Sequence, residues 1–383
     1  MFRSAPAGGG LCGIVLTLAI ALLVPGTASA RASDRFAGVN YAFYPSIPTT
    51  DARRMARGGV ATARFGLEWF QVQRAQGPYD WSDADETIGN LASHGIEPIP
   101  VLFGTPYWAT DGALLQPIAD LQIPILTPFT NGTAYPPNDT ARGSQGWAAF
   151  VEAAARRYGP GGSYWQGPYR AEHPKAAPLP IRVWQVWNEP NLSYYFWPVP
   201  SVAKYGDLVR ISHDALTAVD PGAKVALAGL PCRAAYTCAR FLTDLYAQPG
   251  LRRDFDLVAV HPYGPSVHFM LHEIRPVRDV MDENGDRHTQ IWVSEFGWGS
   301  DPPGSHYNVG PLGQARLLTK SYRAFRHVRR RLGLWGADWF DWRDSPGAQG
   351  TCLWCAHTGL FDADGIPKPS WAAYRRAVRR NGR

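Results

Sequence analysis

Residues 181–191, IRVWQVWNEPN, place a short apolar run directly before a polar, acidic end. The first seven residues are rich in Val, Ile and Trp, a composition that predicts a buried β-strand. Asn188-Glu189-Pro190 follows at the carboxyl end of that strand. If the strand belongs to a parallel barrel, Glu189 points into the barrel mouth.

Seven further apolar runs recur along the chain. The eight predicted strands cover residues 36–43, 61–65, 97–103, 181–187, 224–230, 257–261, 290–294 and 337–342. The stretches between them predict helices over residues 82–94, 145–158, 202–219, 239–247, 313–331 and 370–379. Strand and helix alternating eight times favour an α/β fold, a single closed (β/α)8 TIM barrel, over an open sheet.

Two insertions rich in Pro and Gly interrupt this alternation. Residues 109–143 follow the third predicted strand, so this long loop is expected to arch over the catalytic face of the barrel. Residues 159–180 precede the fourth strand and are expected at the opposite face. No repeat, linker or low-complexity segment separates a second domain, so one catalytic barrel domain is expected over residues 31–383.

The amino-terminal segment has the features of an export signal. Arg3 is followed by an apolar run over residues 11–24 and by the small residues Ala28-Ser29-Ala30, a pattern that predicts a secretory signal peptide over residues 1–30. We therefore expect a secreted, extracellular protein that begins at Arg31 and has no membrane attachment after cleavage. The apolar run is shorter than the roughly 20 residues of a membrane span, and an uncleaved anchor is the alternative.

Four cysteines follow the predicted signal peptide, at Cys232, Cys238, Cys352 and Cys355. In an oxidising compartment such residues form disulfides, and four cysteines allow three connectivities. The local pairs, Cys232 with Cys238 and Cys352 with Cys355, are favoured because each would close one loop. A zinc site is the rival, since Cys352 and Cys355 have the spacing of metal ligands.

Composition and charge exclude several classes of protein. The chain has 383 residues, of which 45% are hydrophobic and 18% charged, which excludes disorder, collagen and coiled coil. The net charge of +6 comes largely from residues 326–331 and 375–383, which are interpreted as surface arginines on the last two helices, with no nucleic-acid partner. Aromatic residues make up 13%, more than a core requires, so some are expected on a binding surface.

No metal or cofactor is expected. His261, His268 and His272 are not accompanied by a His-Glu-x-x-His motif or a comparable cluster of carboxylates. The glycine-rich turns at Gly58-Gly59 and at residues 159–162 have no Lys-Ser/Thr behind them, so a nucleotide-binding loop is not predicted.

A second predicted strand also ends in a carboxylate among aromatic residues, at residues 292–298, WVSEFGW. Glu189 and Glu295 would then both face the barrel mouth. Glycoside hydrolysis needs such a pair, one carboxyl group to protonate the leaving oxygen and one carboxylate to attack the anomeric carbon. Three other acids, Glu68, Glu152 and Glu273, are expected to be solvated or locally paired.

With residues 187–191 (WNEPN) and 294–297 (SEFG), the sequence resembles clan A of the retaining glycoside hydrolases. These enzymes are eightfold barrels with Asn-Glu-Pro closing the fourth strand and the nucleophile on the seventh. Further matches occur, in order, at Arg64, Tyr79-Asp80-Trp81, Asp85, residues 105–109 (TPYWA), residues 261–264 (HPYG) and Lys368-Pro369-Ser370. The pattern is similar above all to glycoside hydrolase family 39, which includes β-xylosidases, α-L-iduronidases and bacterial exopolysaccharide endoglycosidases.

The resemblance implies a role for each carboxylate. Glu295 would be the nucleophile, kept ionised by Arg64 and by a hydrogen bond from Tyr263. Glu189 would be the general acid and base, protonated when substrate binds, with a pKa raised by an aromatic surround such as Trp187. The resemblance also assigns substrate binding to Arg64, Asn188, His261 and Tyr263, with Asn188 on the sugar 2-hydroxyl.

Aromatic platforms for sugar rings are expected at the strand ends, because the apolar face of a pyranose packs on aromatic rings. The candidates are Trp108, Trp298, Trp339 and Trp342, together with residues 194–197 after the acid. Trp339 and Trp342 face opposite sides of a strand, and Trp342 is preferred for the cleavage subsite because it is nearer the catalytic end. Trp69, Trp147, Trp165 and Trp184 are expected to fill the core.

These features predict a retaining hydrolase that cuts a β-linked polysaccharide internally by double displacement. Family 39 xylosidases usually carry a β-sandwich after the barrel, and its lack here favours an open cleft in a monomer. An exo-acting β-xylosidase and a transglycosylase are the alternatives. A barrel that binds carbohydrate without cleaving it is the alternative of a different class.

Overall fold

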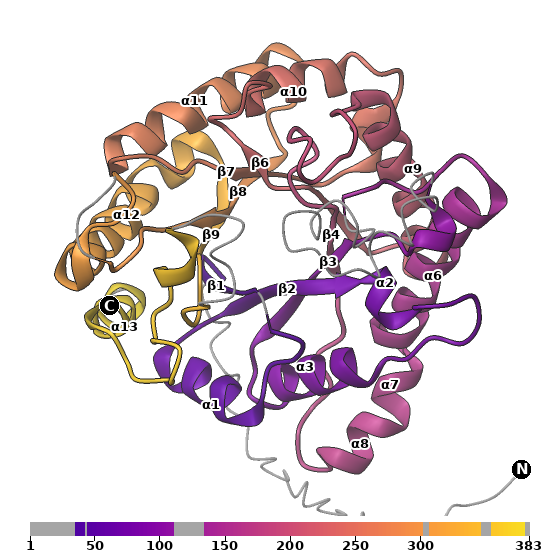
Figure 1. Ribbon diagram of the computed structural model, residues 1–383, viewed down its shortest axis with the longest axis horizontal. Helices are drawn as coiled ribbons and strands as arrows, with labels where there is room; N and C mark the ends of the chain where they lie inside the picture. The colour runs from indigo at the N-terminus through magenta and orange to yellow at the C-terminus, as the bar shows by residue number, and fades with distance from the viewer. Residues whose placement is uncertain (1–34, 43, 111–133, 302–305, 346–353, 380–383) are drawn as a thin grey trace, which may run out of the picture. The chain divides into compact units, whose positions relative to one another are not determined.

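The computed structural model describes residues 35–42, 44–110, 134–301, 306–345 and 354–379. Its strands are β1 (Ala37–Tyr41), β2 (Thr62–Glu68), β3 (Glu97–Phe103), β4 (Val183–Val186), β5 (Lys224–Leu227), β6 (Leu230–Pro231), β7 (Leu257–His261), β8 (Gln290–Phe296) and β9 (Leu334–Trp339). They form one parallel sheet in the order β5-β4-β3-β2-β1-β9-β8-β7-β6, which a pairing of β5 with β7 closes into a barrel (Figure 1). The short β6 continues β5, so the barrel has eight positions and the predicted (β/α)8 fold is confirmed.

β3 and β7 have their predicted bounds, and β1, β2, β4 and β8 differ from theirs by at most three residues at either end. The two remaining predicted strands are changed more. The predicted run 224–230 is divided, because β5 pairs with β4 while β6 pairs only with the end of β7. The predicted run 337–342 is displaced toward the amino terminus, because Gly333, with a φ of 64°, ends the preceding helix and β9 begins at once. Beyond β9 the carboxylate of Asp341 accepts the backbone N–H groups of Ala42 and Trp342, so the chain turns there instead of continuing the strand.

Helices surround the strands (Figure 1). They are α1 (Thr49–Gly58), α2 (Trp69–Val72), α3 (Ser82–Ser93), α6 (Gly146–Tyr158), α7 (Ser163–Gln166), α8 (Pro168–Glu172), α9 (Val202–Val219), α10 (Cys238–Tyr246), α11 (Val267–Glu283), α12 (Gly310–Leu332) and α13 (Pro369–Arg379). The six predicted helices are all present. Five of the described helices were not predicted, of which α2, α7 and α8 have five residues or fewer. The two longer ones are α11, which contains Pro276, a residue that usually ends a helix, and α1, whose buried face is formed only by Asp51, Ala52, Met55 and Gly58.

The structure describes one of the two predicted insertions in full and the other only in part. Residues 159–180 form α7 and α8, and Tyr164, Trp165 and Tyr169 of these helices are buried in the core. Most of the longer insertion, residues 111–133, lies outside the described residues, and so does its expected position over the catalytic face. Residues 1–30, the predicted signal peptide, are also outside the described part of the chain. Within that part, no helix is long and apolar enough to span a membrane.

The barrel interior is apolar at the amino ends of the strands and polar at their carboxyl ends. Ile99, Val183, Ala226 and Trp292 belong to one buried apolar cluster. Two residues further along β4 and β8, the buried side chains are polar, at Gln185 and Ser294. The tryptophans predicted to fill the core, Trp69, Trp147, Trp165 and Trp184, are at most 3% exposed, which confirms that expectation.

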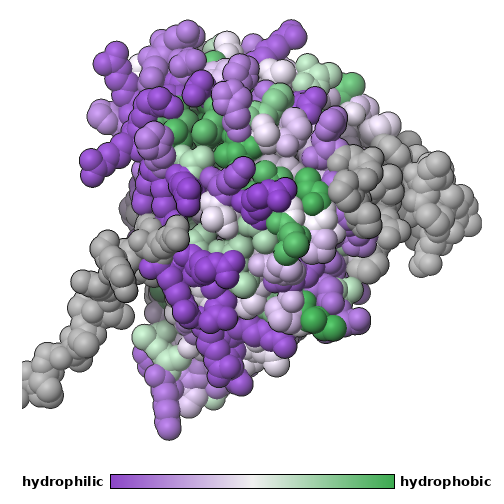
Figure 2. Space-filling model, turned by 90° about the vertical axis from the view of Figure 1, so that its left-hand side faces the viewer, coloured by the Kyte–Doolittle hydropathy of each residue, from purple (hydrophilic) through white to green (hydrophobic). Residues whose placement is uncertain are grey.

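The late arginines contribute to helix packing on the outside of the barrel. Arg326 donates to the carbonyl of Ala377 on α13, and the guanidinium of Arg329 lies 4.6 Å from the ring centre of Phe36. Figure 2, which looks onto the left-hand side of Figure 1, shows a mostly hydrophilic face with small, separate hydrophobic areas.

Cys232 and Cys238 form a disulfide, as predicted. The second predicted disulfide, between Cys352 and Cys355, includes Cys352, which lies outside the described residues. The bond closes the short loop between β6 and α10, and both cysteines are at most 2% exposed.

Replacing both Cys232 and Cys238 with serine should lower the free energy of unfolding by about 2 kcal/mol, because the unfolded chain regains the freedom of a small loop. Urea unfolding of the double variant and of the wild-type protein measures this difference. Equal midpoints would show that the loop is held by its other contacts alone.

Candidate active site

The carboxyl ends of the strands surround one pocket with a volume of about 830 Å³. Its described lining comes from β1, β2, β3, β6 and β8 and from the segments that follow β1, β2, β4, β7 and β9. Of the residues predicted to form the site, Arg64, Asn188, Glu189, Tyr263 and Glu295 line this pocket together.

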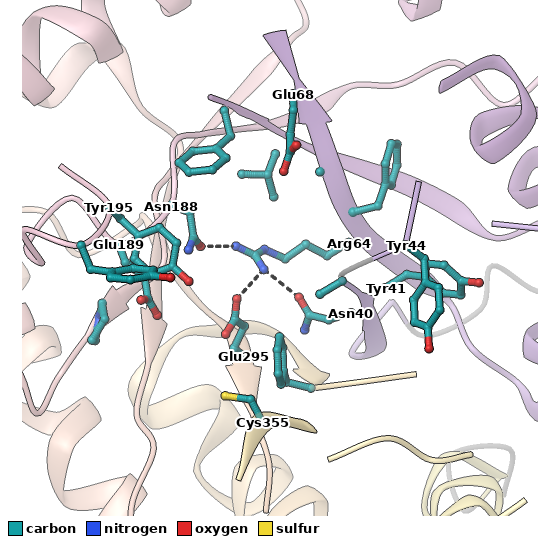
Figure 3. A pocket seen from close by; sticks show the side chains of 18 of the residues that line it. Asn40, Tyr41, Tyr44, Arg64, Glu68, Asn188, Glu189, Tyr195, Glu295 and Cys355 are labelled. Atoms are coloured by element: carbon teal, nitrogen blue, oxygen red, sulfur yellow. Dashed lines mark hydrogen bonds and ion pairs between the residues drawn. The ribbon is translucent and has the colours of Figure 1, made fainter. Parts of the chain in front are cut away.

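Arg64 is the centre of the polar network in the pocket (Figure 3). It lies on β2, is only 6% exposed, and its side chain points along the barrel interior. Its Nε donates to Gln185 Oε1 at 2.6 Å, and Nη1 donates to Asn40 Oδ1 at 2.7 Å and to Glu295 Oε1 at 2.6 Å. Nη2 donates to Asn188 Oδ1 at 2.8 Å. One guanidinium therefore fixes side chains from three strands and the turn after β4.

Glu295 lies on β8 and is 7% exposed. The hydroxyl of Tyr263 donates to its Oε2 at 2.8 Å, while Arg64 holds its Oε1. Burial raises the pKa of Glu295, and the charge of Arg64 and the hydrogen bonds from Tyr263 and Arg64 oppose that rise. The carboxylate is thus held in place and stabilised in its ionised form by two donors.

Glu189 follows β4 on a turn with unusual backbone geometry. Its φ is 48° and that of Trp187 is 70°, values that residues other than glycine adopt rarely and that cluster at functional sites. The amide of Asn191 braces the turn by donating to the carbonyls of Pro231 at 2.9 Å and Tyr236 at 2.8 Å. The turn is therefore strained, and it directs the Glu189 side chain into the pocket.

The environment of Glu189 favours its protonated form. Burial raises its pKa well above the ordinary value, the negative charge of Glu295 raises it further, and the charge of Arg64 only partly opposes both. His261 Nδ1 is hydrogen-bonded to Glu189 Oε1 at 2.6 Å, and burial lowers the pKa of this histidine well below its usual value, so the imidazole is neutral. Of the two carboxyl groups, Glu189 therefore keeps its proton to higher pH.

The two carboxyl groups are close together. One oxygen of Glu189, one oxygen of Glu295 and one nitrogen of His261 lie within 4.8 Å of one another. Such a group has the ligands of a metal site, but the guanidinium of Arg64 contacts Glu295 and its positive charge opposes a cation there. The separation is well below the roughly 6.5 to 9.5 Å that leaves room for a water molecule between the carboxyl groups of an inverting glycosidase.

The four tryptophans proposed as sugar platforms lie elsewhere. Trp298, Trp339 and Trp342 are completely buried, so their positions do not fit that role in this structure. Their indoles are used for packing: Trp298 Nε1 donates to the carbonyl of Gly264, Trp339 Nε1 to that of Thr358, and Trp342 packs on Phe361. Trp108 is partly buried and packs edge-to-face on Trp69, outside the pocket lining.

Other aromatic residues line the pocket instead. They are Tyr41, Tyr44, Phe65, Phe103, Tyr194, Tyr195, Tyr263, Phe340 and Trp354. Tyr194 and Tyr195 follow the acid as expected. Trp354 was missed because it lies in the segment after β9 and at no strand end; its ring packs edge-to-face on Tyr263 and is stacked on Tyr307.

Glu68 was expected to be solvated or locally paired, and it instead lines the pocket at the end of β2. Figure 3 shows its carboxyl group pointing into the cavity, on the side of Arg64 away from Glu295. The side-chain amide of Gln71 donates to it. Burial raises the pKa of Glu68 to about 7, although the hydrogen bond from Gln71 opposes the rise. Glu152 and Glu273 lie outside the pocket lining, and Glu152 is paired with Arg156.

Comparison with solved structures finds the same fold in glycoside hydrolases. A family 39 glycoside hydrolase from the gut symbiont Bacteroides cellulosilyticus WH2 superposes with a TM-score of 0.62 and 19% identity, covering 91% of this chain and 64% of that one. A monomeric beta-xylosidase from Caulobacter crescentus CB15 gives 0.59 and 18%, covering 90% and 68%. GH5_18 from Streptomyces cattleya, in complex with GlcNAc, gives 0.61 and 19%, covering 91% and 80%.

At these identities the likeness concerns the barrel fold, and the chain spans about two thirds of the length of the first two structures. No protein-family model matches the sequence, and no curated protein matches it. The expected resemblance to clan A and to family 39 is therefore supported by shared architecture.

Replacing Glu68 with glutamine should stabilise the protein above pH 7 and leave its stability unchanged below pH 4.5. A carboxyl group whose pKa rises on folding binds more protons in the folded state, so its contribution to stability is lost as pH rises through that window. Because the side chain is partly exposed, the gain should be about 1 to 2 kcal/mol in urea unfolding. Glu152→Gln, on the exposed face of α6, is the matched control and should change little at either pH. If Glu68→Gln lost stability both above pH 7 and below pH 4.5, the prediction would be wrong.

Proposed function

We propose that this protein is a secreted, monomeric retaining glycoside hydrolase that cuts a β-linked polysaccharide internally. The observation that carries the proposal is the pair Glu189 and Glu295, whose nearest oxygens lie within 4.8 Å and of which Glu189 has the more strongly raised pKa, because Arg64 and Tyr263 oppose the effect of burial at Glu295. Secretion rests on the pattern of residues 1–30.

In the first step, a carboxylate oxygen of Glu295 attacks the anomeric carbon while Glu189 gives its proton to the departing glycosidic oxygen. The bond to the leaving sugar breaks with its electron pair on that oxygen, and a covalent glycosyl ester forms on Glu295. In the second step, Glu189, now ionised, takes a proton from a water molecule that attacks the same carbon and frees Glu295.

The surrounding side chains prepare these steps. Arg64 and Tyr263 hold both oxygens of Glu295, which leaves the carboxylate fixed in orientation. Asn188 is held by Arg64 through its Oδ1, so its amide N–H groups are free to face the 2-hydroxyl of the reacting sugar. Once Glu189 has lost its proton, the neutral His261 beside it is the group positioned to stabilise the carboxylate by hydrogen bonding.

Internal cleavage is favoured by the size and lining of the pocket. Its volume of about 830 Å³ is near the upper end of the range for ligand pockets, and aromatic side chains occur on several of its sides. Such rings can support successive sugar units of a chain. Tyr195 lies on the side of Glu189, and Tyr41 and Tyr44 lie on the opposite side (Figure 3).

Protein beginning at Arg31 should release reducing ends from at least one member of a panel of soluble β-linked polysaccharides, as mixed oligomers. Glu295→Gln should lower turnover more than about 10³-fold, because the nucleophile is lost while the fold is kept. Reducing-end assays measure turnover, and product sizing gives the lengths of the oligomers. NMR identifies the configuration of the anomer that forms first.

An anomer of inverted configuration would overturn the retaining mechanism. Release of single sugars alone would indicate an exo-acting enzyme instead. Binding without any turnover across the panel would indicate a carbohydrate-binding barrel.

Arg64→Gln should lower kcat/KM about 10²-fold or more, because the nucleophile and Asn188 lose their common donor. It should also move both limbs of the pH profile to higher pH, since the charge of Arg64 lowers the pKa of both Glu189 and Glu295. Arg182→Gln, which removes an equal charge at an exposed pair with Asp220, is the control and should leave the profile in place. An unmoved profile in Arg64→Gln would contradict the assigned electrostatics.

A further inference from the structure

Glu68 occupies a prepared position in the pocket. It lies on the same face of β2 as Arg64, four residues further toward the mouth, so the two Cα atoms are about 13 Å apart. Gly66 lies between them, and a Cβ atom there would be 3.3 Å from Glu68 Oε1 and 3.4 Å from its Cγ. The missing side chain of Gly66 therefore provides the space into which Glu68 folds back over the pocket floor.

The Glu68 carboxyl group has no positively charged partner in the described part of the chain. The side-chain amide of Gln71 is its hydrogen-bond donor, and no ion pair includes it. Arg64 is the single basic residue in the described lining, against the three acids Glu68, Glu189 and Glu295, and its guanidinium is committed to four other acceptors. By sequence, residues 111–133, 302–305 and 346–353 contain no Lys or Arg.

An unpaired carboxyl group in a partly desolvated pocket is costly for the free protein. The rise of its pKa to about 7 reflects that cost. A ligand that carries a positive charge removes it by completing an ion pair. A neutral hydroxyl could be bound equally well by an amide such as that of Gln71, which lies beside it, so the charge itself points to a cationic group.

We propose that Glu68 is a specificity-determining residue that binds the ammonium group of an amino sugar, a hexosamine with a free amine, within the substrate chain. This inference rests on the proposed function and names its substrate class. The ammonium belongs to a sugar next to the reacting one, because position 2 of the reacting sugar faces Asn188 and the positive charge of Arg64.

Binding to the Glu295→Gln protein, which does not turn substrate over, separates this inference from the proposed hydrolysis. The probes are β-1,4-linked glucosamine oligomers and glucose oligomers of the same length, which differ only in the ammonium or hydroxyl group at position 2 of each sugar. Calorimetry at neutral pH should show the glucosamine oligomer binding more tightly.

Introducing Glu68→Gln into the Glu295→Gln protein should weaken binding of the glucosamine oligomer about tenfold or more. The affinity for the glucose oligomer should change by no more than about twofold. Glu68→Asp, which keeps the charge on a shorter side chain, should restore part of the preference. Glu152→Gln, an equal change on the exposed face of α6, should have no effect. Urea unfolding confirms that each variant is folded.

Equal weakening of both oligomers by Glu68→Gln would overturn the inference and assign Glu68 to hydroxyl binding. Failure of the glucosamine oligomer to bind, or binding that Glu68→Gln does not change, would overturn it as well. If the wild-type protein cleaves neutral polysaccharides while either of these results holds, the inference fails and the proposed function stands. If no polysaccharide is cleaved but the charge-dependent binding is seen, the proposed function fails instead.

Discussion

Arg64 brings a permanent positive charge into the barrel interior, where its guanidinium donates to Asn40 on β1, Gln185 on β4, Asn188 after β4 and Glu295 on β8. A guanidinium has several donors in one rigid plane, so a single side chain can fix all four acceptors at once. Its charge also opposes the rise in pKa that burial imposes on the carboxyl groups. The geometry and the protonation of the pocket therefore depend on the same group.

Much of this arrangement could be predicted from the sequence, because a parallel barrel gives each strand end a fixed place. Glu189 and Glu295 each follow an apolar run, and eight such runs close into one ring, so the two carboxyl groups had to meet at the mouth. The exceptions are local. α11 was missed because Pro276 hides a helix whose other residues are suitable, and β9 was displaced because the left-handed Gly333 starts the strand early.

Most of the aromatic residues that line the pocket could not be predicted from the sequence. Trp298, Trp339 and Trp342 are near strand ends, yet their large rings fill the space between barrel and helices and are completely buried. Position along a strand does not determine whether a ring faces the pocket or the core when the strand end is irregular, as it is where the register of β8 and β9 shifts. Glu68 was missed for a related reason, because its inward position depends on the space above Gly66.

The contacts of Asn191 connect the turn that carries Glu189 to a disulfide bond. Asn191 follows the Glu189-Pro190 turn and donates to two carbonyls, one of which belongs to Tyr236 in the loop closed by Cys232 and Cys238. The strained turn under Glu189 is thus supported by a segment whose conformation is restricted by oxidation. Oxidation of the two thiols and alignment of Glu189 are linked through Asn191, so a chain folded under reducing conditions would reach the barrel fold with the Glu189 side chain less firmly oriented.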